Sequence, residues 1–374
     1  MNKKEDRTQV RIWKVGVLSL LLAVLLALTG CGKEAPEDYV KERLEKLQAG
    51  DEEMAEMLLQ AGIESVDGSY VAAFPKDLKN RYQEFLKKAC GYFTYTVKEA
   101  EAYNSDYRVK VEIAPAKVGD AVEALDAEYV QTLESTELTE AVETLLPKAE
   151  EQLETCDNGR KKELTLEIRE KGSSYELTKD SQKELAEHLL SGYMEPYQAV
   201  AEVLDIRDYL QSVLDATYKG EVSKYARHTG STEEQAREKY EKSFSGEELA
   251  AMELSAEQEQ RFQEAMKKIF AGSRYEIGAM QKTADGGYVT QVTVTPNLSL
   301  QKSSQELHTN AKSGKYGSEA QLVEGYLTTL ETYAQQPVYG EATTVELHLS
   351  TGAILMSGDA MQEVSRLMEQ ILPS

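Results

Sequence analysis

The chain has 374 residues, with 65 acidic and 42 basic side chains and a formal net charge of −23 at pH 7. This acidic balance argues against a nucleic-acid partner, because phosphate backbones are bound by clusters of Lys and Arg. Three cysteines are too few for a disulfide framework.

The first 30 residues have the organisation of a secretory targeting segment. Val15 to Leu28 is an uncharged, mostly aliphatic stretch of 14 residues, whereas a helix that spans a bilayer needs about 20. It fits the apolar region of a signal peptide. Leu28, Thr29 and Gly30 then lead to Cys31. An uncleaved anchor with an incidental Cys31 is the minor alternative. A basic region comes first, made by Lys3, Lys4, Arg7, Arg11 and Lys14.

This order resembles the lipobox of bacterial lipoproteins. The resemblance implies cleavage before Cys31 and acylation of that cysteine, with palmitate-type chains holding the protein on the extracellular side of the cell membrane. Residues 1–30 would be the lipoprotein signal peptide, and 31–37 the lipidated N-terminus and short tether. Residues 1–30 hold five basic and two acidic side chains, so the remainder carries 37 and 63, a net charge of −26. Such a charge repels anionic lipid, so we expect the acyl chains to do the anchoring.

The remaining chain repeats itself. Asp38-Tyr39-Val40 matches Asp208-Tyr209-Leu210, and the segment 81–88 matches 261–268. Later matches keep the same order at offsets between 170 and 182. We therefore predict two copies of one domain, at 38–196 and 204–374. The stretch from 192 to 204 would join them as a short, partly helical connection, so we expect the copies to touch.

The predicted elements follow the same order in both copies. In the first copy, helices over about 38–48, 54–58 and 81–88 precede a hairpin of alternating strands at 93–97 and 107–113. A long polar helical region ends near Pro147, and a second hairpin follows at 164–168 and 175–177. Asp180 or Ser181 caps a closing helix.

In the second copy, Leu210 to Tyr218 begins the domain and Ser231-x-x-Glu234 has the pattern of a capping box. Strands are expected around Tyr275, at 288–294 and at 345–349, with a polar helix over 322–333 that ends near Pro337. Asp359 would cap the last helix.

This alternation of helices and hairpins predicts an α+β class, with two tandem copies that each pack helices on one antiparallel sheet built from two hairpins. A cystatin-like or nuclear-transport-factor-like curved sheet is one such architecture.

The sequence carries no motif for a catalytic, cofactor-binding or metal-binding site. His188, His228, His308 and His348 are scattered, and no pair has the spacing of metal ligands on a helix. We therefore predict no enzyme activity, no cofactor and no metal. Cys90 ends an apolar helical pattern and is expected to be a buried thiol, although its pairing with Cys156 stays open.

Two recurring features have a functional and a structural interpretation. Arg81 with Glu84 and Arg261 with Glu264 would form either a recognition patch or, as we favour, i,i+3 ion pairs on an exposed helix face. Tyrosine is abundant, with 21 residues against six Phe and one Trp, and could stack on a glycan or line a peptide groove. The recurring tyrosines fall on apolar phases, so core packing is expected; they are Tyr39, Tyr95 and Tyr107, matched by Tyr209, Tyr275 and Tyr288.

With its lipobox, duplication and Tyr-rich α+β copies, the whole chain resembles uncharacterised surface lipoproteins of Gram-positive bacteria. That resemblance supplies no catalytic residues. The leading hypothesis is a non-catalytic envelope module that binds a peptide, glycan or protein partner. The alternatives are an envelope hydrolase, which a cleft with converging acids in one copy would favour, and a spacer, which would have no pocket and a large apolar interface between copies.

Overall fold

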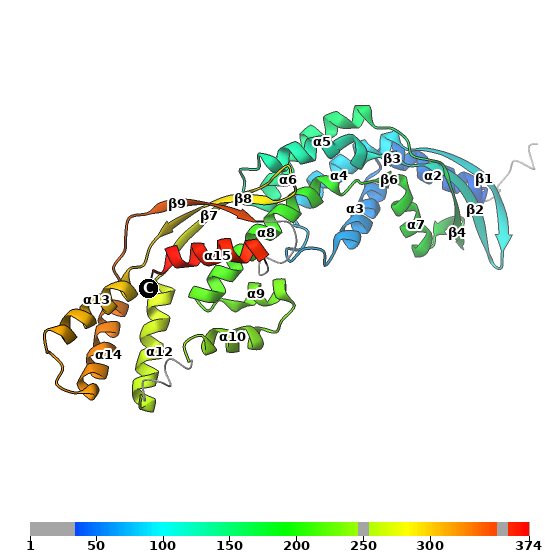
Figure 1. Ribbon diagram of the computed structural model, residues 1–374. Coiled ribbons are helices and arrows are strands. Elements are labelled where there is room, and N and C mark those ends of the chain that lie inside the picture. The colour runs from blue at the N-terminus through cyan, green and yellow to red at the C-terminus, as the bar shows by residue number, and fades with distance from the viewer. Residues whose placement is uncertain (1–33, 246–253, 350–357, 374) are drawn as a thin grey trace, which may run out of the picture.

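The computed structural model describes residues 34–245, 254–349 and 358–373, which form a mixed α/β fold with antiparallel sheets. The molecule is elongated, and the long helix α8 (Glu195–Tyr218) runs between its two ends (Figure 1). We refer to residues 34–194 as the first half and to residues 219–373 as the second half.

The first half begins with three helices. Proline suits the first turn of α2, which begins at Pro36, because its missing N–H would have no partner there. Asp51 caps α3 by accepting a hydrogen bond from the Met54 amide. The helices of this half are α2 (Pro36–Gln48), α3 (Glu52–Val66), α4 (Leu78–Ala89), α5 (Val118–Gln131), α6 (Leu138–Gln152) and α7 (Lys179–Leu189), with short 3-10 turns at Cys90–Tyr92 and Leu153–Thr155.

Both predicted hairpins of the first half are present and join in one antiparallel sheet, in the order β1-β2-β4-β5. Val111 pairs with Leu164 on the face that α2 and α7 cover. On the other face Arg108 binds Glu167, so that face is a set of exposed ion pairs. The strands are β1 (Thr94–Tyr103), β2 (Asp106–Ala114), β4 (Lys162–Lys171) and β5 (Ser174–Leu177).

A two-residue parallel pair fixes the start of α5 beside the chain that enters α8. Strand β3 (Ala116–Lys117) pairs with β6 (Leu190–Ser191). Gly192 follows with a φ of 70°, and a Cβ there would lie 2.5 Å from the Cα of Gly119. Only glycine fits both the left-handed backbone and this close approach. The geometry therefore brings α5 alongside α8.

The second half has a described three-stranded sheet, in the order β7-β8-β9, which packs against α8 and α15. Tyr218 at the end of α8 donates a hydrogen bond of 2.9 Å to the carbonyl of Met368, which ties α8 to the last helix. The elements are α9 (Val222–Thr229), α10 (Glu233–Lys242), α12 (Ala256–Ala271), β7 (Arg274–Lys282), β8 (Tyr288–Thr295), α13 (Ser299–Lys312), α14 (Glu319–Gln335), β9 (Thr343–Leu349) and α15 (Gly358–Ile371).

Backbone features of the first half recur in the second. The β1–β2 register shifts between Val97 and Ala100, and the β7–β8 register shifts between the residues 180 positions later, 277 and 280. An isolated bridge joins residues 116 and 158, and another joins 297 and 339, each 181 positions further on. Helices α13 and α14 begin 181 positions after α5 and α6. The two halves thus share local geometry as well as sequence.

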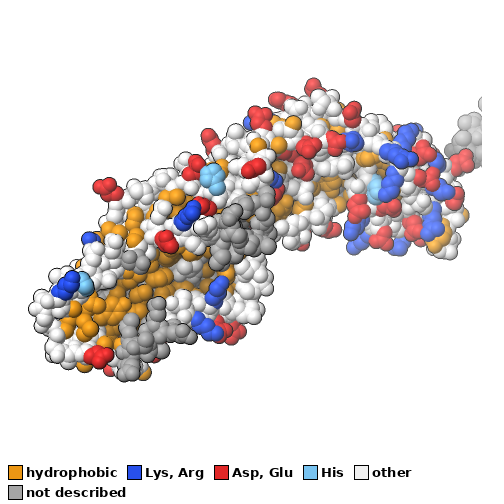
Figure 2. All heavy atoms as spheres, in the orientation of Figure 1, with side chains coloured by type: hydrophobic (Ala, Val, Ile, Leu, Met, Phe, Trp, Pro, Cys, Tyr) orange, Lys and Arg blue, Asp and Glu red, His pale blue; other side chains and the backbone are white. Residues whose placement is uncertain are grey.

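One hydrophobic core runs through the first half, α8 and the sheet of the second half. Among its largest fully buried side chains are Tyr82, Phe85 and Tyr197. The helices α12 and α14 form a smaller cluster around Phe262, Leu327 and Leu330. Figure 2 shows hydrophobic side chains gathered on the visible surface of the second half, whereas charged side chains dominate the first.

Helix α8 departs from the predicted connection. The stretch from 192 to 204 is not a separate linker, because α8 continues unbroken from Glu195 to Tyr218 and contains both predicted boundary positions, 196 and 204. No Gly or Pro interrupts residues 197–219, so helical propensity runs through the boundary. The two halves are consequently joined by a rigid element.

Helix α6 also departs from the prediction, because it passes through Pro147 and ends at Gln152. Proline removes one helical hydrogen bond to the carbonyl four residues earlier. Both Pro147 and Glu143 are exposed, so water can satisfy that carbonyl. The second counterpart, α14, ends at Gln335, before Pro337 as expected.

Two predicted helix caps are displaced. The capping box of α10 is formed by Thr232 and Gln235, one residue after the predicted pair, while Ser231 lies against the Thr229 hydroxyl. Helix α7 is capped by Thr178 and not by Asp180 or Ser181. The Ser181 hydroxyl instead accepts a hydrogen bond from the Glu167 amide of β4. Asp359 lies at the start of α15, where side chains are outside the described part.

Candidate functional site

The residues predicted for lipidation lie outside the described part of the chain. These are Cys31 and the lipobox residues Leu28, Thr29 and Gly30. In the residues that the structure describes, no helix is both long enough and apolar enough to cross a membrane.

The two recurring arginines do not pair along their own helix, so the predicted i,i+3 pairs are wrong. Arg81 reaches from α4 to Glu150 on α6. Arg261 reaches from α12 to Glu331 on α14, with Nε to Oε1 at 2.7 Å, and also binds Glu324. Each arginine joins the corresponding pair of helices in its half, α4 to α6 in the first and α12 to α14 in the second. Packing places the carboxylate of the neighbouring helix within reach of the guanidinium.

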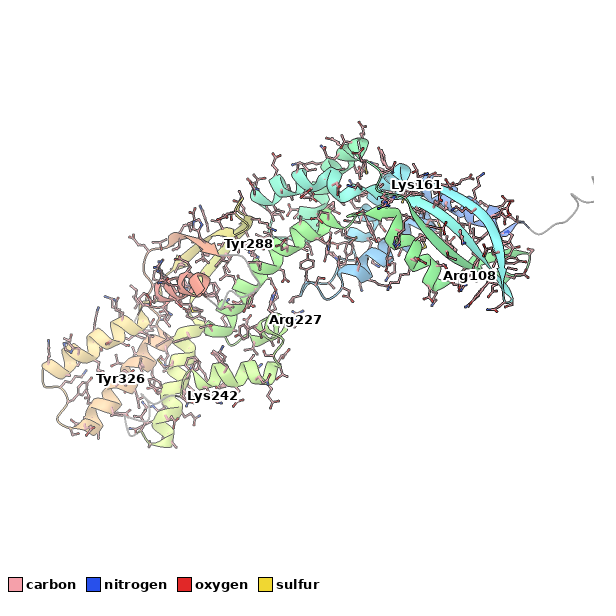
Figure 3. All side chains as sticks on the ribbon, turned by 45° about the vertical axis from the view of Figure 1, so that its right-hand side comes forward. Arg108, Lys161, Arg227, Lys242, Tyr288 and Tyr326 are labelled. Carbon is pink, nitrogen blue, oxygen red and sulfur yellow. The ribbon has the colours of Figure 1, made fainter. Side chains whose placement is uncertain are left out.

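The recurring tyrosines lie in or against the core, as expected from their apolar phases. Tyr288 is 4% exposed, and its hydroxyl donates to Glu202 of α8 at 2.7 Å. In Figure 3 this residue lies where the sheet of the second half meets α8. Tyr275 similarly donates to Asp215 of α8. Tyr275 and Tyr288 join the second half to α8 and are not an open stacking platform.

Cys90 and Cys156 are free thiols, which answers the question of their pairing. Cys90 is buried, as predicted, and burial raises its pKa to about 12. The described residues contain no group of three or more His, Cys, Asp or Glu arranged to hold a metal ion.

One histidine that sequence reasoning passed over is built into the fold. His228 stacks on the ring of Tyr209, with centroids 5.1 Å apart. Its Nε2 lies 3.1 Å from Asp208, and its Nδ1 lies 3.8 Å from Asp205. Its role here is to hold α9 against α8.

A cleft of about 460 Å³ lies where α5, α8 and the β7–β8 turn meet. Its residues on α5 and on α8 recur three and four positions apart, so each helix presents a single face to the cleft. The loop before α4 adds Tyr70, and the β7–β8 turn of the second half closes the cleft. The lining residues are Tyr70; Glu123, Asp126, Ala127, Val130 and Gln131; Glu195, Gln198, Ala199 and Glu202; and Lys282, Thr283, Ala284 and Gly286.

Contacts of the second half with α8 and with the first half hold this cleft in shape. Arg207 of α8 donates to the carbonyls of Ile277 and Gly278 in β7 at 2.7 and 2.8 Å. Gln281 donates to the carbonyl of Leu133, beyond the end of α5. The turn of the second half is therefore fixed over helices of the first half, and the cleft needs both halves.

Asp126 is the unusual residue of the cleft. Its side chain is nearly inaccessible, with the residue 3% exposed, and neither carboxylate oxygen has a hydrogen-bond partner among the described residues. Burial, with a smaller contribution from the negative charge of Glu195, raises the pKa of Asp126 to about 7. A buried carboxylate without a partner is costly to the fold, and such a group in a cleft points to a functional site.

The rest of the cleft is predominantly acidic. Glu202 is already satisfied, because Lys282 donates to it at 2.8 Å and Tyr288 donates to its other oxygen. Burial works to raise the pKa of Glu202, but these hydrogen bonds outweigh it and lower that pKa. Lys282 is the one Lys or Arg among the described lining residues. Glu123, Asp126 and Glu195 have no ion pair with a cation in the described part of the chain.

A second cavity, of about 500 Å³, is a weaker candidate. It lies between α3 and α7, and its cations are exposed at the surface. Lys162 contacts Nε2 of His188, whose Nδ1 donates to the Glu184 carbonyl. These two side chains already have partners in the fold, and no buried side-chain N or O atom of the described lining residues lacks a hydrogen-bond partner.

The described residues of the second half do not repeat the two acids that α5 contributes to the cleft. The position 181 residues after Asp126 is Leu307, and the position matching Glu123 is Ser304. Sequence reasoning missed Asp126 because carboxylates are abundant throughout the chain. A signal was nevertheless present: the buried positions of α5 are Val118, Val122, Asp126 and Val130, an apolar stripe interrupted by one acid.

Fold and site together define a mixed α/β protein with antiparallel sheets and an acidic cleft at the junction of its halves. No protein-family model and no curated protein sequence matches the chain. A structural similarity is found to the crystal structure of YcdA from Bacillus subtilis, a protein proposed to be a lipoprotein. The TM-score is 0.33 at 11% sequence identity, over 76% of this chain and 97% of that one. Agreement at this level carries no argument about fold or function.

Proposed function

We propose that this protein is a lipid-anchored cell-envelope module that binds a small ligand, such as a short peptide or a glycan unit, in the cleft around Asp126. The observation that carries the proposal is a buried, unpartnered carboxylate lining a cleft that two halves build together. Burying an unpartnered carboxylate costs free energy in the unbound protein. A ligand that donates hydrogen bonds to this group would remove that cost, and the difference would add to the affinity.

The exposed sheet face is the weaker binding surface. Its charges are paired across the strands, as in Lys98 with Glu112 and Glu163. The exposed Tyr103 ring is covered by the Arg108 guanidinium at 3.3 Å. A binding partner would have to break these contacts, whereas the cleft contains the Asp126 carboxylate, which has no hydrogen-bond partner among the described residues.

The lipid anchor is supported by the sequence around Cys31. Helix α2 begins at Pro36, so only four residues lie between the acylated position and the fold. A fully extended tether of this length reaches roughly 15–20 Å. The first half, which carries α5 and Asp126, would then sit next to the outer face of the membrane. Replacing Cys31 by Ser should move the protein from the membrane fraction to the medium; retention in the membrane would contradict the anchor.

We also propose that the two halves are copies of one domain. The support is the recurrence of the strand bulge, the isolated bridge and the interhelical arginine clamp at spacings of 180 to 181 residues. Because α8 continues across the predicted boundary, it serves both copies. The cystatin-like or nuclear-transport-factor-like architecture remains a prediction from the sequence.

Ligand binding can be tested with a variant that fills the cleft. Ala284 is an exposed lining residue in the β7–β8 turn, so Ala284→Trp should occupy the cleft without disturbing the core. Ala124→Trp, at an exposed position of α5 outside the lining, is the matched control. The full-length chain is incubated with a digest of bacterial envelope, and the retained compounds are identified by mass spectrometry.

We expect one or more compounds to be retained by the wild type and by Ala124→Trp but not by Ala284→Trp. If the two variants retain the same compounds as the wild type, the cleft is not the binding site and the proposal is wrong.

A hydrolase is the second candidate, because Asp126 and Glu195, two acids whose environments differ, line the same cleft. A carboxyl with a pKa near 7 beside a second carboxylate is an arrangement that glycoside hydrolysis uses. The described lining residues include no His, Ser or Cys, and we favour binding. Mass spectrometry of the retained compounds distinguishes the two, since a hydrolase converts its ligand to products and a binding module returns it unchanged.

The spacer hypothesis is supported in one respect and opposed in another. The halves share a continuous apolar core through α8, as a spacer would require. The acidic cleft is not expected of a spacer, because an unpartnered carboxylate weakens the fold without benefit.

A further inference from the structure

The chemistry of the cleft restricts what it can bind, if the proposed ligand function holds. Three carboxylates, Glu123, Asp126 and Glu195, line it without a cation of their own. An anionic ligand would add to this repulsion, and a neutral one would leave it in place. The ligand therefore needs a positive charge.

The walls next to these acids are partly apolar. Ala127 and Val130 of α5 and Ala199 of α8 line the cleft, together with the ring of Tyr70. The Tyr70 hydroxyl is oriented toward the Gln198 carbonyl at 3.4 Å. Aliphatic carbons can pack on these surfaces, and an aromatic face also attracts a cation. The ligand should combine a charge with a short apolar chain.

The position of Asp126 selects among organic cations. The residue is 3% exposed, and both of its carboxylate oxygens are buried without a hydrogen-bond partner among the described residues. An ammonium on a flexible stem is a compact point charge that needs little room beside a buried carboxylate, whereas guanidinium is a wide planar group. We infer that the cleft binds a primary ammonium group at the end of a short aliphatic chain, as in a diamine or a lysine-type peptide side chain, with Asp126 as its counter-ion.

Binding of 1,5-diaminopentane to the full-length chain in non-ionic detergent, measured by isothermal titration calorimetry, tests the inference. We expect saturable binding to the wild type and a loss of at least tenfold in affinity for Asp126→Asn, which keeps the shape and removes the charge. Glu195→Gln should weaken binding by a smaller factor. Glu128→Gln, on the exposed side of the same helix, is the control and should bind as the wild type does.

Two further ligands separate the inference from the proposed function. The neutral analogue 1,5-pentanediol should bind at least tenfold more weakly than the diamine. Equal affinity for the two, or equal affinity of wild type and Asp126→Asn for the diamine, would overturn the ammonium inference. If the diamine fails but envelope compounds are still excluded by Ala284→Trp, the inference falls and the binding function stands; if both fail, both fall.

The pH dependence gives a readout that a merely structural Asp126 would not show. Below pH 7 the buried carboxyl is protonated and has no charge to offer, so affinity should rise roughly tenfold between pH 6 and pH 8. Glu195 and Glu123 face the same space, as do Glu202 with Lys282, and Tyr82 lies behind Asp126. A diamine stays protonated over this range. In Asp126→Asn the affinity should be independent of pH across it.

Discussion

The two halves share a framework but differ in what covers their helix pairs. In the first half α5 and α6 pack against α8, and Ala141, Val142 and Leu145 of α6 are completely buried. In the second half the positions 181 residues later are Leu322, Val323 and Tyr326 of α14; Leu322 is 38% exposed and the other two are partly buried. The difference teaches that α8 completes the first half, and that no described helix does the same for the second.

This asymmetry also explains where the candidate site lies. The cleft forms between α5 of the first half and α8, and the β7–β8 turn of the second half closes it. At the corresponding place in the second half, Leu307 replaces the acid and is partly buried. The acids Glu123 and Asp126 of α5 therefore correspond to Ser304 and Leu307 at the matching positions of α13, and it is the pair of acids that lines the cleft with α8.

The largest expected effect on stability comes from placing a charge on α6, and it is compared with the same charge at the matching position of α14. Ala141→Glu would bury an unpaired carboxylate where the native side chain is 0% exposed, and we expect a loss of about 4 kcal/mol or more in the free energy of unfolding. Leu322→Glu, at the matching position, should cost less than about 1 kcal/mol. Urea denaturation followed by circular dichroism measures both. Similar losses in the two variants would mean that α14 is covered as completely as α6.

The sequence predicts those features of the two halves that depend on residues close together in the chain. Alternating residues such as Tyr107, Val109 and Val111 identify the strands, because a half-buried strand imposes a period of two. The matching of residues 81–88 with 261–268 located the recurrence. These signals are local, and the corresponding elements are confirmed.

The features that sequence reasoning missed depend on packing between distant segments. Arg81 was assigned to Glu84, three residues away, although Glu150 is its partner 69 residues on. That pair recurs as Arg261 with Glu331, so comparing the two halves for paired charges could have found it. Asp126 differs from the many other acids only by its burial, and the cleft around it needs α8 and a turn 160 residues later.

The second largest effect is expected from the buried charge of Asp126, which is costly to the fold. Because burial raises the pKa of Asp126, the folded chain holds its proton more tightly than the unfolded chain; the stability that this gives is present below about pH 4 and is lost as the pH rises through about 7. Asp126→Asn should therefore stabilise the protein at pH 8, by up to about 4 kcal/mol for a shift of about three pKa units.

At pH 4 that stabilisation should nearly vanish, because the native carboxyl is then also neutral. Leu307→Asn, at the matching position of the second half, is the comparison and should not stabilise the protein at either pH. Thermal denaturation of both variants at pH 4, 6 and 8 measures the effect. A gain that does not depend on pH would show that Asp126 is not the ionising group.

The smallest expected effects on stability come from removing the carboxylates of the two arginine clamps, Glu150 with Arg81 and Glu331 with Arg261. Burial works to raise the pKa of Glu150, but hydrogen bonds from Lys88 and Arg81 outweigh it and lower that pKa. The carboxylate is 12% exposed, whereas its counterpart Glu331 is 33% exposed. Glu150→Gln should cost about 1–2 kcal/mol at pH 7, and Glu331→Gln about half as much, because solvent screens the more open pair.

Both costs should shrink as the pH falls through the lowered pKa values, since the native carboxylates are then protonated too. Added salt should reduce the cost of Glu331→Gln more than that of Glu150→Gln, because exposed pairs are screened more strongly. Urea denaturation at pH 7 and pH 3, at low and high salt, provides the measurement. If Glu331→Gln proved the more costly of the two, burial would not be what distinguishes the clamps, and the contacts of Arg261 with both Glu324 and Glu331 would be the stronger arrangement.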